Sequence, residues 1–292
     1  MTAPGGAEQG STGTADARHL FRGRTAVITG ASSGIGAGFA RHAAALGMRL
    51  VPTDVAADRL AALAEELAAG GAEVEPVPAD VTDPAAVEAV AVRADERFGG
   101  ADMLVNNAGI MAMGYSWEIP AETWDAALRI NVGGTANGLR AFVPRMLDRG
   151  TRAWIVDVSS VGGLLPAPLM APYSATKFAV LALTESLKYE LDMRGAPIQV
   201  SVVTPGSVKS DIFRAASGAA GAAPEAERFG ALLHERAENS GLTAEEHARR
   251  VFDQVAEGRY WVVPQPEQLD PGLQPRTDMI LERAEPRLPF EI

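Results

Sequence analysis

The sequence predicts an α/β protein: one domain with a doubly wound, mostly parallel seven-stranded sheet and helices on both faces. Short apolar runs of β type alternate with longer helical patterns from residue 24 to residue 263. This alternation is typical of parallel strands joined by right-handed crossovers. With 292 residues, of which 47% are hydrophobic, the chain has enough apolar material for one large core.

The apolar runs predict each element in turn. Strands are expected at 25–29, 49–53, 73–78, 101–105, 153–158, 198–203 and 260–263. Helices are expected at 34–46, 56–69, 84–98, 121–148, 172–193, 224–239 and 243–257. Pro76 places the third strand at an edge of the sheet, because proline donates no hydrogen bond to a neighbouring strand. Asp83 and Pro84 form a typical helix start, and Gly133–Gly134 indicates a kink in the 121–148 helix.

The two ends of the chain are expected to lie outside a domain that spans residues 21–264. Residues 1–20 are rich in small residues and lack the apolar core of a secretory signal, which predicts a disordered tail. Residues 265–292 contain five prolines and are expected to form an extension over the surface.

Composition excludes several classes of function. A formal net charge of −11 disfavours nucleic acid as a partner. The absence of cysteine excludes disulfides and thiolate chemistry. The four histidines show no metal-ligand spacing, so we expect no metal, and no apolar run approaches the ~20 residues that cross a membrane. A soluble, cytoplasmic protein is the expectation that remains.

A glycine-rich turn, TGASSGIG at Thr29–Gly36, ends the first strand and begins the first helix. Gly30 permits a tight turn, Gly34 lets the backbone approach a pyrophosphate, and Gly36 lets strand and helix pack closely. The helix start offers free N–H groups to phosphates. A structural turn is the alternative, but the position at the first strand–helix junction favours dinucleotide binding.

The spacing TGxxxGxG, followed by Asn106–Asn107–Ala108–Gly109 after the fourth strand, resembles the classical short-chain dehydrogenase/reductase family. The resemblance covers residues 21–263 and implies a Rossmann fold with a nicotinamide dinucleotide cofactor. It assigns cofactor contacts in these two segments to Gly30, Ser32, Ser33, Gly34, Ile35, Gly36, Asn107, Ala108 and Gly109.

Asp54, at the end of the second strand, predicts NAD rather than NADP. Its carboxylate can accept hydrogen bonds from both adenosine ribose hydroxyls and would repel a 2′-phosphate. A solvated acid or a cap for the following helix would explain the same residue. The positions where NADP-preferring relatives typically carry basic residues hold Val55, Ser32 and Ser33. Arg49 and Arg59 lie nearby and keep NADP open.

Asp80–Val81, after the third strand, resembles the family pair that contacts adenine. A turn-forming aspartate explains Asp80 almost as well. After the sixth strand, Pro205–Gly206–Ser207–Val208 matches the family turn beside the nicotinamide. Ser210 stands where threonine is usual in the family. The resemblance therefore adds cofactor contacts at Asp80, Val81, Pro205, Gly206, Val208 and Ser210.

Tyr173 and Lys177 lie four residues apart at a helix start, so their side chains face the same way. An ammonium group beside a phenol lowers its pKa from ~10, which lets Tyr173 take a hydroxyl proton or return it. A chance Tyr-x-x-x-Lys usually marks a surface helix. Ser160, however, precedes Tyr173 by thirteen residues, the family's spacing for its catalytic serine.

In the family pattern Ser160 holds the substrate oxygen and Lys177 also reaches the nicotinamide ribose. Ser159 is the alternative, with a spacing that fits less well. Asn131 resembles the fourth member of the catalytic group, which bends its helix and holds a water linked to Lys177. An ordinary polar helix residue is the other interpretation of Asn131.

The substrate-binding parts are less specific. Residues 211–240 take the place of the family's substrate lid. Apolar residues that would line the pocket are Met111, Leu164, Leu165 and Phe213. They predict a medium-sized, mainly apolar secondary alcohol or ketone. The 172–193 helix is apolar on more than one face, which together with the resemblance predicts a homodimer or homotetramer.

We therefore expect an oxidoreductase that transfers a hydride between NAD(H) and a secondary alcohol or ketone. An NADPH-dependent ketoreductase is the alternative. A regulator that binds NAD(P) without turnover is disfavoured, because Tyr173 and Lys177 are both present. An enoyl reductase would usually separate these two residues more widely.

Overall fold

The computed structural model describes residues 12–210, 212 and 223–288, with the side chains of residues 12–16 excepted. Seven parallel strands form one sheet in the order β3-β2-β1-β4-β5-β6-β7. Their bounds are β1 Thr25–Thr29, β2 Arg49–Asp54, β3 Val77–Pro78, β4 Met103–Asn106, β5 Ala153–Val158, β6 Ile198–Val203 and β7 Trp261–Val262. The predicted seven-stranded, doubly wound sheet is confirmed, with β3 at an edge.

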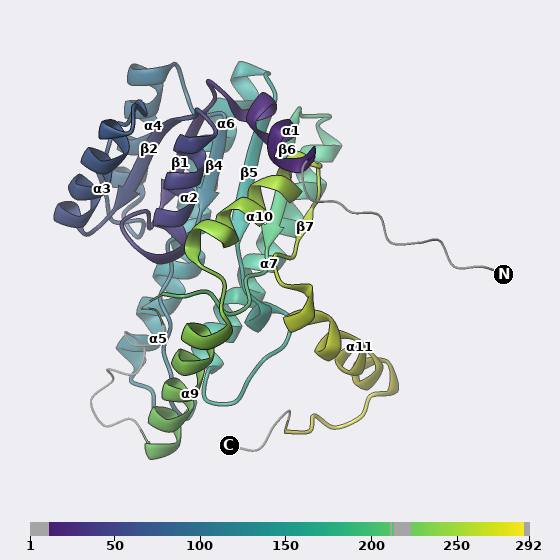
Figure 1. Ribbon diagram of the computed structural model, residues 1–292. Helices are drawn as coiled ribbons and strands as arrows, with labels where there is room; N and C mark the ends of the chain where they lie inside the picture. The colour runs from purple at the N-terminus through teal and green to yellow at the C-terminus, as the bar shows by residue number, and fades with distance from the viewer. Residues whose placement is uncertain (1–11, 211, 213–222, 289–292) are drawn as a thin grey trace.

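Helices cover both faces of this sheet (Figure 1). One face carries α1 Thr12–Phe21, α2 Gly34–Ala45, α3 Ala57–Ala69 and α10 Ala244–Ala256. The other face carries α4 Pro84–Phe98, α6 Gly134–Arg149 and α7 Ala171–Met193. On β5, Trp154 and Val156 enter the first core, whereas Ala153 and Ile155 enter the second. Strands buried on both faces read as continuous apolar runs, which is why they were visible in the sequence.

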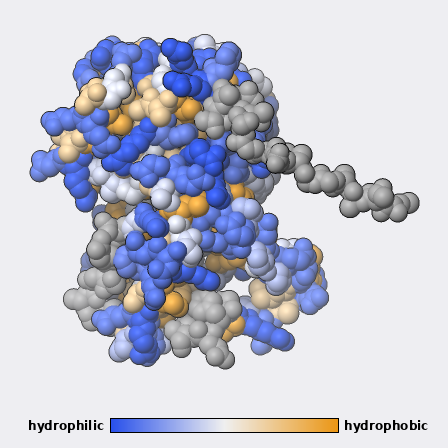
Figure 2. Space-filling model, in the orientation of Figure 1, coloured by the Kyte–Doolittle hydropathy of each residue, from blue (hydrophilic) through white to orange (hydrophobic). Residues whose placement is uncertain are grey.

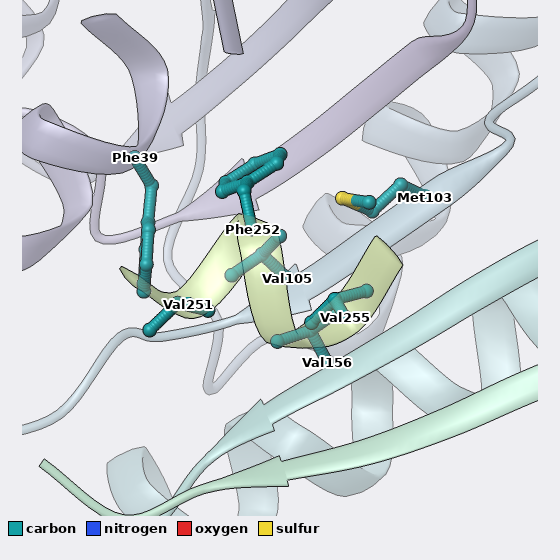
Figure 3. A pocket seen from close by; sticks show the side chains of 7 residues that line it. All are labelled: Phe39, Met103, Val105, Val156, Val251, Phe252 and Val255. Atoms are coloured by element: carbon teal, nitrogen blue, oxygen red, sulfur yellow. The ribbon is translucent and has the colours of Figure 1, made fainter. Parts of the chain in front are cut away.

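The packing between α10, α2 and the sheet is close. Figure 3 shows the side chains that meet there: Phe39, Met103, Val105, Val156, Val251, Phe252 and Val255. The space left among them has no room for a water molecule. This region is core packing and holds no ligand. The surface seen in Figure 2, by contrast, is mostly hydrophilic, with hydrophobic residues in small groups.

The expectation of a disordered tail up to residue 20 is wrong from residue 12 onward, where α1 begins. Ala17 and Phe21, one helical turn apart, are both fully buried. The Phe21 ring meets the edge of Trp154 at a centroid distance of 5.3 Å and Phe252 at 5.6 Å. Burial of this one apolar face stabilises the helix, a tertiary effect that composition does not reveal.

The expected C-terminal extension is also ordered, because α11 spans Pro266–Glu282. Pro266 lies in its first turn, where proline is tolerated, while Pro271 and Pro275 lie inside it. Together with α5 Ala121–Ala127 and α9 Pro224–Ser240, α11 lies beyond the sheet, in the lower part of Figure 1. Among the described residues, no helix combines the length and apolar character that a membrane crossing needs.

The predicted 121–148 helix is divided into three parts. A π-helix, Leu128–Gly133, separates α5 from α6, and the predicted kink site at Gly133–Gly134 falls at its end. Such π segments occur frequently at functional sites, since they turn one side chain out of the regular helical path.

Candidate active site

A cleft of about 1230 Å³ opens where the strands end. In an open parallel sheet the carboxyl ends of the strands are the usual place for a ligand. Most of the predicted cofactor residues line it: Gly30, Ser33, Gly34, Ile35, Gly36, Asp54, Asp80, Val81, Asn107, Ala108, Gly109, Tyr173, Lys177, Pro205, Gly206, Val208 and Ser210. Ser32 is not among the lining residues.

The glycine turn has the tightness that its sequence predicts. Gly30 has φ +65°, and a Cβ atom there would come within 2.8 Å of the Ala108 Cα. A Cβ atom on Gly36 would overlap the Gly30 carbonyl oxygen. Asn107 holds the turn, because its Nδ2 donates to the Thr29 oxygen (2.8 Å) and the Gly30 oxygen (3.2 Å).

The start of α2 is free to receive an anion. Ser33 is its N-cap residue, yet no side chain caps the helix. The first N–H groups of the helix therefore have no side-chain acceptor, and the residues that carry them line the cleft. An uncapped helix start beside a glycine cradle fits the pyrophosphate of a dinucleotide.

Asp54 forms a turn and does not cap α3, because Ala56 is the N-cap residue and no side chain caps this helix. Its Oδ1 accepts from the Ala56 N–H (2.9 Å), and its Oδ2 accepts from the Ser32 N–H (3.0 Å). Asp54 also lines the cleft, as does Arg59. Arg49 does not line it, because its guanidinium lies 5.4 Å from the Phe98 ring centroid.

Asp80 forms the turn that was the alternative interpretation: its Oδ1 accepts from the Thr82 N–H (2.8 Å). Asp80 and Val81 nevertheless both line the cleft. Val81 packs closely on Gly134 of α6, where a Cβ atom would lie 2.8 Å from its Cγ2. The turn thus fixes this wall of the cleft without filling it.

α7 brings Tyr173 and Lys177 to the same face of the helix, at the cleft. The Lys177 Nζ lies 5.8 Å from the Tyr173 ring centroid and donates to the Val158 oxygen (2.8 Å). Hydrogen bonding by the Ser160 side chain acts to lower the pKa of Tyr173, and the Ser160 hydroxyl oxygen accepts from the Gly162 N–H (3.0 Å). Ser159 is used differently, because its buried hydroxyl donates to the Lys177 carbonyl oxygen (2.9 Å). Ser160, Tyr173 and Lys177 are therefore grouped as the spacing predicts.

The charge balance of this group differs from the sequence expectation. Burial raises the pKa of Tyr173, and the hydrogen bond with Ser160 opposes this by less. We expected Lys177 to lower that pKa, so the direction is opposite in the protein alone. Burial also lowers the pKa of Lys177 to about 8, with Asp157 acting against it. At both side chains desolvation outweighs the opposing interaction, which is the hydrogen bonding of Ser160 at Tyr173 and the charge of Asp157 at Lys177.

Asn131 lies in the π-helix and is buried behind the cleft. Its Oδ1 accepts from the Ile110 N–H (2.8 Å), and its Nδ2 donates to the Ile110 oxygen and the Thr176 Oγ1 (both 2.9 Å). A Cβ atom on Gly109 would lie 3.3 Å from its Oδ1 and 3.4 Å from the Lys177 Nζ. Asn131 therefore orders the segment next to Lys177, and its water-holding role stays a prediction.

Of the predicted substrate residues, Met111 and Leu165 line the cleft, whereas Leu164 does not. Leu164 and Leu165 are consecutive in a tight turn, so only one of them faces the cleft. Phe213 lies outside the described residues. Further apolar lining residues that we did not predict are Ile110, Ile130, Val161, Ala167, Met170, Ile212, Phe229, Leu232 and Leu233.

Polar lining residues were missed as well. Four belong to the last two turns of α9, and one belongs to α11: Glu235, Arg236, Asn239, Ser240 and Gln268. The helical pattern of 224–239 placed α9 but gave no sign of which face meets the cleft. No signal in the sequence connected residue 268 with the site. Within the part of the chain described, no three His, Asp or Glu residues form a metal-binding group.

The fold and this grouping define a class: α/β oxidoreductases that bind a dinucleotide at the carboxyl edge of a parallel sheet. The family model of short chain dehydrogenases matches residues 24–220. The chain belongs to the short-chain dehydrogenase/reductase family of oxidoreductases.

Similar proteins span most of the chain. A 1-deoxy-11-beta-hydroxypentalenate dehydrogenase of Streptomyces avermitilis is 43% identical over 192 residues, which cover 65% of this chain and 70% of that protein. A short-chain dehydrogenase/reductase from Burkholderia phymatum in complex with NAD has a TM-score of 0.89 at 36% identity, covering 93% of this chain and 99% of its own. One from Sphingobium yanoikuyae in complex with NADPH has a TM-score of 0.70 at 28% identity, covering 92% and 98%.

Proposed function

We propose that this protein is an NAD-dependent alcohol dehydrogenase that interconverts a secondary alcohol and the corresponding ketone. The observation that carries the proposal is the grouping of Ser160, Tyr173 and Lys177 at the inner wall of a dinucleotide-sized cleft. These are the groups that proton transfer at a carbinol oxygen needs, and no covalent attachment of the substrate is required.

Each side chain then has one task. In oxidation the Tyr173 oxygen accepts the hydroxyl proton of the substrate, and in reduction it returns that proton to the carbonyl oxygen. The Ser160 hydroxyl donates to the same substrate oxygen and stabilises its developing negative charge. The Lys177 ammonium favours the phenolate form of Tyr173. The bound nicotinamide ring supplies the hydride acceptor or donor.

The preference for NAD rests on Asp54. Its carboxylate stands at the end of β2 on the cleft wall, where a 2′-phosphate would meet negative charge. Arg59, on the same wall, supports the alternative, an NADPH-dependent ketoreductase. Relatives in complex with NAD and with NADPH both exist. Asp54 outweighs Arg59 because its carboxylate is held in place by two backbone N–H groups.

The substrate is proposed to be medium-sized and mainly apolar. Met111, Met170 and Phe229 pack with Tyr173 in one apolar cluster at the cleft. A ketone or alcohol bound there would place its hydrocarbon part against these side chains and its oxygen at Tyr173. The Streptomyces relative, named for a hydroxypentalenate, supports this substrate class by similarity.

We also infer a homodimer or homotetramer in the cytoplasm, with neither nucleic acid nor membrane as a partner. The support for assembly is the outer face of α7, where Ala182 is exposed and Tyr189 and Met193 are 60% and 87% exposed. A second copy would cover these side chains. The net charge of −11 argues against nucleic acid, and a chain without cysteine suits a reducing compartment.

The direct test is NADH formation at 340 nm, a standard assay wavelength, with a panel of secondary alcohols. Tyr173→Phe is expected to lower kcat/KM by roughly 10²–10⁴-fold, because proton transfer loses its partner. Tyr189→Phe is the matched control, since that side chain is exposed on the same helix and its hydroxyl, within the described part of the chain, bonds only Glu185. Cofactor binding without turnover on any alcohol would favour the nucleotide-sensing regulator instead.

A further inference from the structure

The beginning of α11 meets the turn Pro205–Val208 through two glutamine side chains. The Ser207 N–H donates to the Gln268 Oε1 (2.8 Å), and the Ser207 carbonyl oxygen accepts from the Gln265 Nε2 (2.8 Å). Both backbone polar groups of Ser207 are thus held by side chains that lie about sixty residues later in the sequence, and its carbonyl oxygen also accepts from the Leu242 N–H (3.1 Å).

Gly206 makes this approach possible. A Cβ atom at that position would lie 2.5 Å from the Gln268 Oε1 and 3.1 Å from the Gln265 Oε1. Any larger residue would push the two amides away from the backbone. The glycine of this turn therefore has a local packing reason that involves α11.

The two glutamines differ in exposure. Gln265 is 1% exposed, and its Oε1 is buried without a hydrogen-bond partner among the described residues. Gln268 is half-buried and lines the cleft, and its Nε2 has no partner in the part of the chain described. An unsatisfied buried amide oxygen is unfavourable, so the position of Gln265 depends on the bond from its Nε2 to Ser207.

The rest of α11 fixes the two glutamines in place. Leu269 is 3% exposed, and Gly272 packs on Leu165, where a Cβ atom would lie 2.7 Å from its Cδ1. The Arg276 guanidinium lies 5.3 Å from the Phe178 ring centroid on α7. Movement of α11 would therefore displace Leu165 in the cleft wall as well as the turn Pro205–Val208.

We propose that Gln268 is a positioning residue for cofactor binding, which acts by holding the Ser207 peptide while Gln265 holds its other side. The inference rests on the proposed function, in which the turn Pro205–Val208 receives the nicotinamide end of the cofactor. It makes α11 part of the active-site wall, although this helix lies outside the residues 24–220 that match the family model.

The experiment compares three single variants of the full chain, each titrated calorimetrically with NADH and with NADPH. Gln268→Met keeps the length of the side chain but removes the acceptor for the Ser207 N–H. Gln268→Glu keeps an acceptor and removes the amide donor. Gln274→Met makes the same change on an exposed part of α11, where the side chain bonds only Asp278. Thermal unfolding without cofactor is measured for each.

Gln268→Met is expected to weaken binding of the preferred cofactor about five- to tenfold, as loss of one hydrogen bond does. Gln268→Glu and Gln274→Met are expected to bind within about twofold of the wild type, with unfolding midpoints like that of Gln268→Met. Wild-type cofactor affinity in Gln268→Met, or equal losses of affinity in the Met and Glu variants, would overturn the role of Gln268 and leave the proposed function standing. If the wild type binds neither nucleotide, the proposed function fails and the inference fails with it.

Discussion

Asp157 on β5 is a fully buried carboxyl group close to the proposed catalytic group. Its Oδ1 accepts from the Asn106 Nδ2 (2.8 Å), and its Oδ2 lies 2.9 Å from the Thr184 Oγ1. That hydroxyl also lies 2.7 Å from the Val180 carbonyl oxygen, and its one proton serves only one acceptor. A protonated Asp157 can donate to Thr184 while Thr184 donates to Val180, whereas the ionised form has to share the Thr184 proton with Val180. Burial raises the pKa of Asp157 to about 6, against the hydrogen bonds from Asn106 and Thr184 and the charge of Lys177, so the carboxyl group is ionised at neutral pH and protonated below about pH 6.

A pH dependence of stability follows. Because the pKa of Asp157 is higher in the folded chain, its contribution to the free energy of unfolding is full below about pH 4. That contribution is lost as the pH rises through about 6. Asparagine keeps one acceptor and one donor but does not ionise, so Asp157→Asn is expected to remove this loss of stability with rising pH. Urea unfolding between pH 4 and 8 measures it, with the exposed Asp192→Asn as the control. A variant whose pH profile parallels that of the wild type would contradict the assignment.

The proposed preference for NAD over NADP rests on the single negative charge of Asp54. Asp54→Asn keeps an acceptor for a backbone N–H but removes the negative charge. We expect the ratio of kcat/KM with NAD to that with NADP to fall at least about tenfold, because a 2′-phosphate is no longer repelled. Asp58→Asn, on the exposed side of α3, controls for a general change in charge. An unchanged ratio would leave Arg59 as the residue to examine for NADP binding.

At the scale of elements, α2 and α10 pack around two histidines. Burial lowers the pKa of His42 and of His247 to about 4, and Arg249 and Arg250 add to the effect. His247 is fully buried, and neither ring nitrogen has a hydrogen-bond partner among the described residues. Both histidines are therefore neutral in the folded chain and take up protons when the α2–α10 contact opens.

The sign for these histidines is opposite to that of Asp157. Their contribution to the free energy of unfolding is present above pH ~6.5 and is lost as the pH falls toward 4. His247→Leu is expected to reduce the loss of stability between pH 6.5 and 4. Urea unfolding at a series of pH values measures it, and His19→Leu, on the exposed side of α1, serves as the matched control. Equal acid sensitivity in the two variants would show that His247 is not responsible.

Assembly is a question for the whole molecule. The exposed face of α7 is proposed to be covered by a second copy, so a charged residue at its centre is expected to weaken the contact. Ala182→Arg should lower the molar mass measured by light scattering at micromolar concentration, because an unpaired guanidinium would be buried. Ala68→Arg, on the exposed face of α3, makes the same change elsewhere. A wild type that is monomeric would contradict the proposed homo-oligomer itself.

Local patterns determined a large share of this fold. Strands such as β5 and β6 matched their predicted ranges, because a strand buried on both faces is a continuous apolar run. The glycine turn was predictable since a positive φ at Gly30 and a close backbone approach at Gly30 and Gly36 admit only glycine. The grouping of Ser160, Tyr173 and Lys177 followed from spacing and resemblance, and its geometry agrees.

Other features depended on contacts between distant parts of the chain. The tail prediction failed at α1 because Phe21 is buried by Trp154 and Phe252, which belong to other elements. The pKa of Tyr173 is raised in the protein alone because burial, which no local pattern reports, outweighs the interaction with Ser160. Gln268 reached the site only through the packing of α11. The strands, the glycine turn and the spacing of Ser160, Tyr173 and Lys177 could be predicted from the sequence, since each depends on residues close together in the chain. The desolvation of Tyr173 and Lys177 and the contribution of α11 to the cleft depend on the tertiary structure, since both require groups that only folding brings together.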